Sequence, residues 1–197
     1  MEIRFCDDND IIEVGKFYDN VVLYLLKTIN YPKWEYKIYP SELSVREKVL
    51  ANQQLMCIDE DSIVGAFVLN TDPQGKYEKT GWTKNLLLGE YMVCHTLAVS
   101  PDVQGKGIGK QMVEFCIQYA KDNGYKGIRL DVVPDNLPAR SLYEKCGFNY
   151  EWHTGERYNG MWKKGKMDGI GKMWEKSGHG YKGVWRNNSC VEILERW

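Results

Sequence analysis

Apolar residues recur along this chain with two different spacings, one typical of helices and one typical of strands. A helical spacing of three or four residues runs from about Ile11 to Ile29 and again from Ile108 to Ala120. Short apolar or alternating runs predict strands at residues 2–5, 54–59, 63–69, 91–99 and 127–133. Strands and helices are therefore expected to alternate along most of the chain.

Polar residues mark where the helices begin. Asp8 and Asn9 are positioned to cap the first helix. The quartet Ser44–Glu47 has the form of a capping box and predicts the start of a second helix. Asn136 precedes a short helix that is expected from about Leu137 to Lys145.

Composition sets broad limits on what the chain does. Its 197 residues suit one domain with a small appendage, and the formal net charge of -1 predicts no attraction to nucleic acid or anionic membranes. The acidic start and the lack of a long apolar run argue against a signal peptide and a membrane-spanning helix, so the cytoplasm is the expected compartment. The 6 cysteines are scattered without Cys-x-x-Cys spacing and are expected to be reduced, mostly in the core.

The most informative segment follows the strand at residues 91–99. This strand leads into a loop in which Gln104, Gly105, Gly107 and Gly109 open an amphipathic helix. Glycines at this spacing let backbone N–H groups gather around one point, and the helix N-terminus adds partial positive charge. The loop is therefore expected to hold a phosphate or pyrophosphate. It lacks both the Gly-Lys-Ser/Thr ending of a P-loop and the spacing of a Rossmann loop.

Two motifs resemble those of the GNAT superfamily of N-acyltransferases. The first is Gln-x-x-Gly-x-Gly at residues 104–109, which follows Val-x-Pro at residues 99–101. The second is Asn-x-x-Ala-x-x-Leu-Tyr-x-Lys-x-Gly-Phe at residues 136–148. The resemblance implies a GNAT acyl-CoA N-acyltransferase fold over residues 1–155. That fold is of the α/β class, with an α+β mixed sheet whose central strands splay to leave a V-shaped slot for acyl-CoA.

The resemblance also implies a reaction. It implies an acetyl-CoA-dependent N-acetyltransferase in which a primary amine attacks the thioester directly, with no metal and no covalent enzyme intermediate. The implied acceptor is a small amine, an amino acid or a protein N-terminus, with no nucleic acid and no membrane as partner. The implied cofactor-binding residues are Leu97, Ala98, Val99, Gln104, Gly105, Lys106, Gly107, Ile108, Gly109, Lys110, Asn136, Ala139 and Tyr143.

Acyl transfer to an amine needs an acid for the departing thiolate and a base for the amine. Tyr143 lies where many GNAT enzymes place the tyrosine that protonates the CoA thiolate, and a buried core tyrosine is the alternative interpretation. The base stays open between Asp131, His95 and Glu90, or a chain of water molecules. Asp131 lies where the ribosomal-protein N-terminal acetyltransferases carry a glutamate base, whereas a neutral histidine is a natural base near pH 7.

Aromatic residues in two variable segments are candidates for the acceptor pocket. Trp34, Tyr36 and Tyr39 lie in a segment bounded by prolines, and Tyr77 and Trp82 lie in a long polar stretch farther along the chain. Because aromatic faces hold ammonium groups through cation–π contact, the first three are predicted to bind the acceptor. The alternative is that these rings only anchor their loops.

The tail repeats one aromatic and glycine pattern. Tyr-x-Gly-x-Trp occurs at residues 158–162 and again at 181–185, and Asn188 stands where the first copy has Gly165. This recurrence resembles the MORN repeat, a β-hairpin module in which glycines are expected at turns and aromatic rings across strands. Residues 156–197 are therefore predicted to form a MORN-like β-hairpin extension, and the alternative is the last strands of the preceding domain.

Two such repeats seldom bury their own hydrophobic face. The extension is therefore expected to pack on the acyltransferase sheet or on another subunit, as in a homodimer. Two alternative functions follow for the whole chain. One is an acyl-CoA-binding domain without turnover that uses the tail to dock a protein, and the other is a self-associating structural protein.

Overall fold

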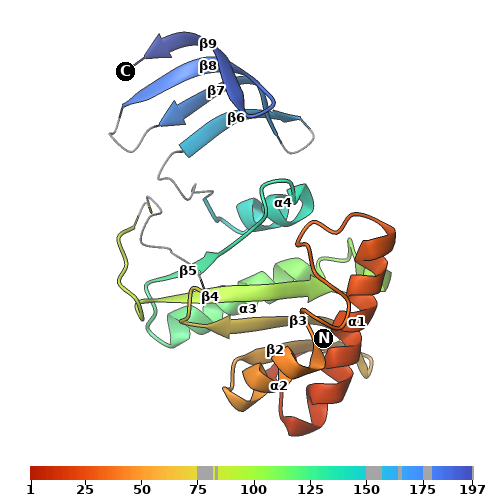
Figure 1. Cartoon of the computed structure of the whole chain (residues 1–197). Helices are drawn as coiled ribbons and strands as arrows, with labels where there is room; N and C mark the ends of the chain where they lie inside the picture. The colour runs from red at the N-terminus through yellow and green to blue at the C-terminus, as the bar shows by residue number, and fades with distance from the viewer. Residues whose placement is uncertain (75–81, 83, 150–156, 164–165, 175–178, 197) are drawn as a thin grey trace. The chain divides into compact units, whose positions relative to one another are not determined.

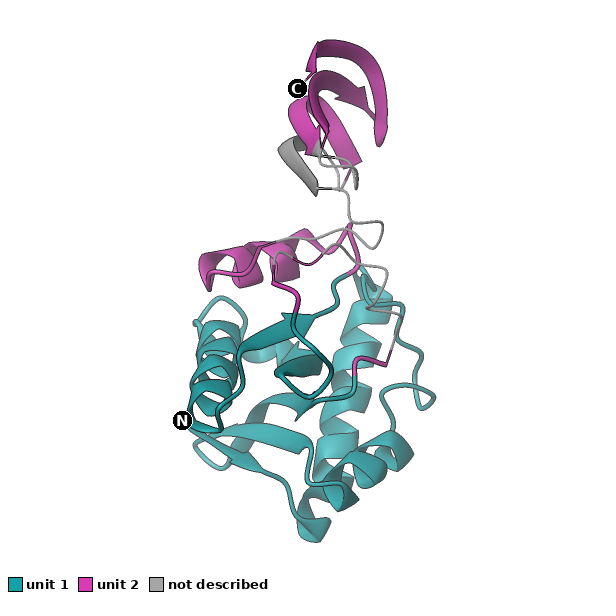
Figure 2. Ribbon diagram, turned by 90° about the vertical axis from the view of Figure 1, so that its left-hand side faces the viewer, with its two compact units in different colours: residues 1–72, 86–132 teal, residues 73–85, 133–197 magenta. Residues whose placement is uncertain are grey.

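Figure 1 shows the chain as a computed structural model that describes residues 1–74, 82, 84–149, 157–163, 166–174 and 179–196. The backbone forms two compact units, residues 1–72 with 86–132, and residues 73–85 with 133–197 (Figure 2). The first unit contains β1 (Glu2–Phe5), η1 (Asp8–Asp10), α1 (Ile11–Lys27), α2 (Glu42–Leu50), β2 (Gln54–Asp59), β3 (Ser62–Asn70), β4 (Tyr91–Val99), η3 (Pro101–Val103), α3 (Ile108–Asp122) and β5 (Gly127–Leu130). The second unit contains α4 (Leu137–Lys145), β6 (Arg157–Lys163), β7 (Lys166–Trp174), β8 (Gly180–Arg186) and β9 (Ser189–Arg196).

The sheet of the first unit has the strand order β1-β2-β3-β4-β5. The first four strands are antiparallel neighbours, whereas β5 runs parallel to β4. Glu60 and Asp61 form the turn between β2 and β3 with φ of 46° and 63°, as a tight hairpin requires. The mixed α/β fold expected from the sequence is therefore confirmed.

Helices cover both faces of this sheet (Figure 1). α1 and α2 pack on one face, where Val14, Tyr18 and Val45 join a core with Met56 of β2 and Ala66 of β3. α3 packs on the opposite face. The apolar stripe predicted for α3 is confirmed, because all of its members join the core there: Ile108, Met112, Phe115, Cys116, Tyr119 and Ala120.

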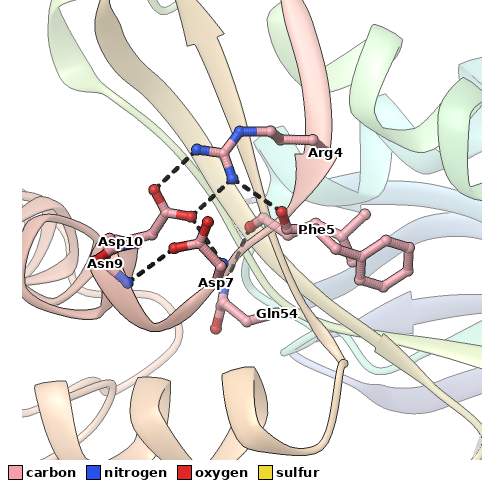
Figure 3. Close-up of polar contacts among 7 residues, drawn as sticks. Arg4, Phe5, Asp7, Asn9, Asp10 and Gln54 are labelled. Carbon is pink, nitrogen blue, oxygen red and sulfur yellow. Dashed lines mark hydrogen bonds and ion pairs between the residues drawn. The ribbon is translucent and has the colours of Figure 1, made fainter.

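A polar cluster holds the start of α1 against β1 (Figure 3). The Asp7 carboxylate accepts a hydrogen bond from the Asn9 N–H, and the Asp10 carboxylate accepts one from the Asp7 N–H, each at 2.8 Å. The Arg4 guanidinium donates to both carboxylate oxygens of Asp10, at 2.7 and 2.9 Å. Asp7 therefore caps η1, and α1 follows Asp10, whose side chain forms no cap hydrogen bond to α1. The predicted cap at Asp8 or Asn9 is wrong, because the short turn of η1 precedes the α-helix.

The bounds of two other elements also differ from the prediction. α2 begins after Ser41, and Ser41 and Ser44 accept hydrogen bonds from each other's backbone N–H at 3.4 and 2.9 Å. Ser44 is thus the inner member of the capping box and not the cap. β5 ends at Leu130 and does not continue to residue 133, because its pairing with β4 stops there. α4 spans Leu137–Lys145 behind Asn136, as predicted.

Four of the cysteines lie in the core of the first unit. Cys6, Cys57, Cys94 and Cys116 are buried, which confirms the prediction that most of the cysteines lie in the core. None of the helices in the described part of the chain combines the length and apolar character needed to cross a bilayer.

β6 to β9 form a separate antiparallel sheet in chain order. The β-hairpin character predicted for the tail is confirmed, but Gly160, Gly171 and Gly183 lie within strands and not at turns. Gly171 of β7 pairs with both Gly160 of β6 and Gly183 of β8. A Cβ at Gly183 would lie 2.7 Å from the Sγ of Cys190, so the close approach of neighbouring strands explains this glycine.

The turn between β8 and β9 uses asparagines. Asn187 and Asn188 have φ of 50° and 70°, a left-handed conformation that asparagine tolerates better than most residues. The rings of Tyr181 and Trp185 stack at 5.9 Å along β8. Trp185 also packs with Met167 and Met173 of the neighbouring strand β7, which confirms the predicted packing of aromatic rings across strands. The predicted boundary between residues 155 and 156 lies outside the described residues.

Candidate active site

β4 carries a bulge near its carboxyl end. In the pairing of β3 with β4, Phe67 is opposed by two residues, Thr96 and Leu97. Thr96 adopts a φ of 48°. A positive φ is rare for a β-branched residue, and such strained positions occur mostly where a function requires them.

The extra residue changes which face the β4 side chains occupy. Before the bulge, Cys94 joins the core on the α3 face, so the next residue, His95, lies on the opposite face. After the bulge, Leu97 and Val99 pack against the α3 core, and Ala98 joins the core that α1 and α2 cover. His95 and Ala98 therefore share the α1 face of the sheet.

β5 accompanies only the first part of β4. The pairing runs from Tyr91 with Gly127 to Cys94 with Leu130, whereas β4 continues to Val99. Among the described residues of the first unit, no strand pairs with this side of β4 over residues 95–99. An unpaired strand edge presents backbone N–H and C=O groups, and here that edge coincides with the bulge.

The loop after β4 leads into the N-terminus of α3. Gly105 and Gly107 have φ of 81° and 83°, and a Cβ at either position would meet open space. Gly107 is the N-cap and provides no side-chain hydrogen bond, and Gln111 donates the first helical bond to the Gly107 carbonyl at 3.1 Å. The backbone N–H groups of residues 108–110 therefore have no partner within the helix, which suits an anion.

The side chains of this loop differ in their exposure and in the charge that they present to an anion. Gln104 and Lys106 are exposed, whereas Ile108 is buried and anchors the loop in the α3 core. Lys110 pairs with Glu114 at 3.5 Å, so its charge is partly neutralised. The loop thus offers mainly backbone N–H groups and the ammonium group of Lys106.

His95 lies where β4 meets the end of β3. Its Nε2 lies 2.8 Å from the carbonyl oxygen of Asp72 and 3.2 Å from Oδ1 of Asn70. A backbone carbonyl only accepts hydrogen bonds, so Nε2 carries the proton and Nδ1 holds the lone pair of the neutral ring. Burial lowers the pKa of His95 below 6.5, while the Asp72 carbonyl and the Asp131 carboxylate act in the opposite direction. The ring is therefore neutral at pH 7.

The other two candidate bases differ in their surroundings. The Glu90 carboxylate forms an ion pair with Lys126 and accepts a hydrogen bond from the Leu87 N–H at 2.9 Å. The hydrogen bond from Lys126 lowers the pKa of Glu90, so this carboxylate is a weak base. Asp131 is exposed, directly after the last residue of β5, and is near enough to influence the titration of His95.

The three candidates from the second motif belong to the second unit. Asn136 caps α4, because its Oδ1 accepts a hydrogen bond from the Ala139 N–H at 3.2 Å. Tyr143 is half-buried on the same helix, and its ring centroid lies 6.0 Å from that of Phe148.

The aromatic segment contains one anchored ring and two exposed ones. Trp34 packs edge-on against Tyr18 at 6.0 Å, and its backbone bonds to the Asn30 side chain. Tyr36 and Tyr39 are 40% and 42% exposed. Trp34 thus fixes the segment, while the two tyrosines present their rings to solvent. Trp82 is half-buried, and Tyr77 lies outside the described residues.

Several residues beside the bulge were not predicted. Tyr18 falls on the apolar stripe of α1, yet its hydroxyl donates to the Thr96 carbonyl at 3.0 Å. Gln54 donates to the Phe67 carbonyl at 3.0 Å. The one signal for Gln54 was a glutamine at the start of an otherwise apolar strand, and nothing in the sequence marked the hydroxyl of Tyr18.

Comparison with known proteins identifies a family and several relatives that are similar to this chain. Residues 23–148 match the acetyltransferase (GNAT) family. The chain is 34% identical over 99 residues to mycothiol acetyltransferase of Arthrobacter sp. (strain FB24), covering 47% of this chain and 29% of that protein. It is also 34% identical over 90 residues to streptothricin acetyltransferase of Escherichia coli, covering 46% of this chain and 49% of that protein. The chain thus spans less than half the length of either relative.

Solved structures share the fold at lower identity. An acetyltransferase of the GNAT family from Streptococcus pneumoniae superposes with a TM-score of 0.58 at 20% identity, covering 82% of this chain and 90% of that chain. AAC(6')-Iy in complex with the bisubstrate analog CoA-S-monomethyl-acetylneamine superposes with a TM-score of 0.55 at 13% identity, covering 76% of this chain and 90% of that chain. These likenesses establish the expected fold.

Proposed function

The chain belongs to the GNAT family of acetyltransferases, and on that premise we propose that it transfers an acetyl group from acetyl-CoA to a primary amine. The observation that carries the proposal is the N-terminus of α3, which lacks a side-chain cap and follows the β4 bulge through two left-handed glycines. Phosphate groups suit such a helix end. The pyrophosphate of acetyl-CoA is therefore assigned to residues 104–110, and the pantetheine and thioester to residues 97–99, along the side of β4 that does not pair with β3.

The reaction forms one bond and breaks another. The amine nitrogen attacks the thioester carbon, forming the C–N bond, and the C–S bond breaks to release CoA thiolate. The amine nitrogen loses a proton to a base, and the thiolate gains a proton from an acid. A neutral amine and a protonated acid are both needed at the start, so the two groups require opposite protonation states at the working pH.

We assign the base to Nδ1 of His95. The hydrogen bond from Nε2 to the Asp72 carbonyl fixes the tautomer, and the lowered pKa keeps the ring neutral at pH 7. The Asp131 carboxylate favours the imidazolium that forms when the proton arrives. Glu90 is assigned a structural role, because its carboxylate is held by Lys126 and the Leu87 N–H.

We assign the acid to Tyr143 on α4. A tyrosine has a pKa of about 10 in solution, so its hydroxyl is protonated at neutral pH and can donate to a thiolate. Asn136, which caps the same helix, is assigned to the pantetheine arm together with Ala139.

The acceptor is proposed to be a small-molecule amine. The relatives are named for mycothiol and for streptothricin, which favours a small molecule over a protein. The exposed rings of Tyr36 and Tyr39 supply faces for an ammonium group. The Lys37 ammonium already lies 5.5 Å from the centroid of the Tyr36 ring, so a cationic acceptor would take the place of this lysine.

The tail is proposed to be a MORN-like module appended from residue 156. The Tyr-x-Gly-x-Trp units lie on β6 and β8, each the first strand of a hairpin, which supports this assignment. Its role is then to contact a protein partner or a second copy of the chain. Light scattering on the chain with and without residues 156–197 tests this, because loss of an oligomer on truncation is expected and an unchanged number of subunits contradicts self-association through the tail.

A screen for amine-dependent release of CoA thiol tests the proposed activity. The panel contains diamines, amino acids, amino sugars and peptides with free N-termini, each mixed with acetyl-CoA. Thiol release that requires an amine is expected, and His95→Gln is expected to lower kcat by about 100- to 10,000-fold. Binding of acetyl-CoA without release for any amine would contradict the activity and favour the binding module.

A further inference from the structure

The bulge in β4 is supported by a buried polar network. The Tyr18 hydroxyl lies 3.0 Å from the carbonyl oxygen of Thr96 and 3.4 Å from its Oγ1. The Gln54 side-chain amide lies 3.5 Å from the Tyr18 hydroxyl and 3.0 Å from the carbonyl oxygen of Phe67. Phe67 is the residue of β3 that faces the bulge, so the network reaches the bulge from both strands.

The side chains of this network are positioned by α1 and β2. Tyr18 comes from α1, and Gln54 opens β2, where its carbonyl oxygen also accepts the Cys6 N–H at 2.9 Å (Figure 3). Tyr18 and Gln54 are each only 1% exposed. Burial raises the pKa of Tyr18, so its hydroxyl stays protonated and donates throughout the physiological pH range.

The network contacts the backbone of β4 at Thr96, the residue with the strained φ. Thr96 holds a φ of 48°, which a β-branched residue adopts only when its surroundings fix it. The hydrogen bond from Tyr18 fixes the carbonyl of that residue. Because a trans peptide group is planar, its C=O and N–H point in opposite directions. The Leu97 N–H therefore points away from Tyr18.

We propose that Tyr18 is a positioning residue for catalysis, which holds the Thr96–Leu97 peptide so that the Leu97 N–H hydrogen-bonds the carbonyl oxygen of the acetyl thioester. The proposal rests on the proposed function, since it assigns a role within acetyl transfer. Negative charge grows on that oxygen as the amine attacks, and a fixed backbone donor stabilises it. Tyr18 itself touches neither substrate, and it acts only through the peptide group.

The carbonyl stretch of bound acetyl-CoA reports this hydrogen bond without any amine. Acetyl-CoA labelled with ¹³C at the carbonyl is bound to the full chain, and the isotope-edited infrared band is compared with that of free acetyl-CoA. The wild-type chain is expected to move the band to lower wavenumber. Tyr18→Phe, which removes only the hydroxyl, is expected to lose most of this shift. The matched control is Tyr24→Phe on the exposed side of α1, which is expected to keep the shift in full.

The outcomes separate this proposal from the proposed function. A wild-type chain that binds no acetyl-CoA contradicts the proposed function. A wild-type shift that Tyr18→Phe retains contradicts the role of Tyr18 alone. With an amine acceptor, Tyr18→Phe is expected to lower kcat by about 10- to 100-fold while the KM for acetyl-CoA changes little, because the pyrophosphate contacts remain.

A second pair of variants keeps the test valid if Tyr18→Phe does not fold. Glycine adopts a positive φ without a steric penalty, so Thr96→Gly relieves the strain that Tyr18 offsets. The band of Thr96→Gly is then compared with that of the double variant Thr96→Gly/Tyr18→Phe. A smaller shift in the double variant supports the role of the hydroxyl, and equal shifts overturn it.

Discussion

The Nε2 atom of His95 lies 2.8 Å from the carbonyl oxygen of Asp72, which leaves Nδ1 as the basic atom of the ring. Burial also lowers the pKa of this imidazole below 6.5. A base with a lowered pKa is active above that pKa and lost below it. We therefore expect kcat/KM to fall on acidification with a midpoint below pH 6.5, measured by thiol release in buffers of constant ionic strength.

Two substitutions identify the residue behind this acid limb. His95→Gln keeps a donor near the Asp72 carbonyl but has no base, so the limb is expected to disappear along with most of the activity. Glu90→Gln is expected to keep the limb, because Glu90 contacts Lys126 and the Leu87 N–H. An acid limb that persists in His95→Gln would show that another group is the base.

Gly107 provides a test of the anion site at α3. Its φ of 83° is costly for any residue with a Cβ, so Gly107→Ala is expected to destabilise the loop by about 1–2 kcal/mol. If the same loop binds the pyrophosphate, the Kd for acetyl-CoA rises about tenfold or more. Gly124 is the matched control, because its φ of 76° lies at the other end of α3. Gly124→Ala is expected to cost similar stability with no change in Kd, and equal losses of affinity would contradict the assignment.

Gly65 allows β3 and α3 to pack closely. A Cβ at Gly65 would lie 2.7 Å from the Sδ of Met112 and 3.2 Å from the Ala98 carbonyl oxygen. Met112 is fully buried, so Gly65→Ala is expected to destabilise the chain by about 1–3 kcal/mol in urea unfolding. In the Met112→Ala background the same substitution is expected to cost less, because the two residues share one space. Additive costs would contradict this account of the contact.

The ion pair between Arg4 and Asp10 makes the stability of the fold sensitive to acid. The hydrogen bond from Arg4 lowers the pKa of Asp10 below its ordinary value of 3.8. Such a carboxylate stabilises the fold above the unfolded pKa, and the contribution is lost as the pH falls through the lower, folded pKa. Asp10→Asn is therefore expected to unfold more readily at neutral pH and to show a smaller further loss between pH 5 and pH 2. A parallel acid transition in both proteins, followed by circular dichroism, would contradict this role.

Much of the secondary structure could be predicted from short stretches of sequence. The stripe on α3, the strand Tyr91–Val99 and the start of α4 each follow from spacing and capping that involve only neighbouring residues. Asp7 was missed because three acidic residues lie close together at the start of α1, and only the geometry of η1 selects among them. The position of Gly183 within a strand could not be predicted, because the close approach of Cys190 depends on the pairing of β8 with β9.

The bulge could not be predicted because β4 is apolar on both faces. A strand with one exposed face would have shown a break in its alternation, but residues 91–99 show no alternation to break. The hydroxyl of Tyr18 was equally hidden, because a tyrosine on an apolar stripe is indistinguishable from any other core residue. Its partner Thr96 lies far away in the sequence, so the hydrogen bond belongs to the tertiary fold.

Calorimetric titration of acetyl-CoA into the purified chain tests the central claim most directly. ATP and desulfo-CoA serve as comparisons, because the first shares the adenosine diphosphate portion and the second lacks the thioester sulfur and its acetyl group. We predict micromolar binding of acetyl-CoA that ATP does not reproduce and that Gly107→Ala weakens while Gly124→Ala does not. No binding of acetyl-CoA, or binding that ATP matches, would contradict a site built from the β4 bulge and the N-terminus of α3.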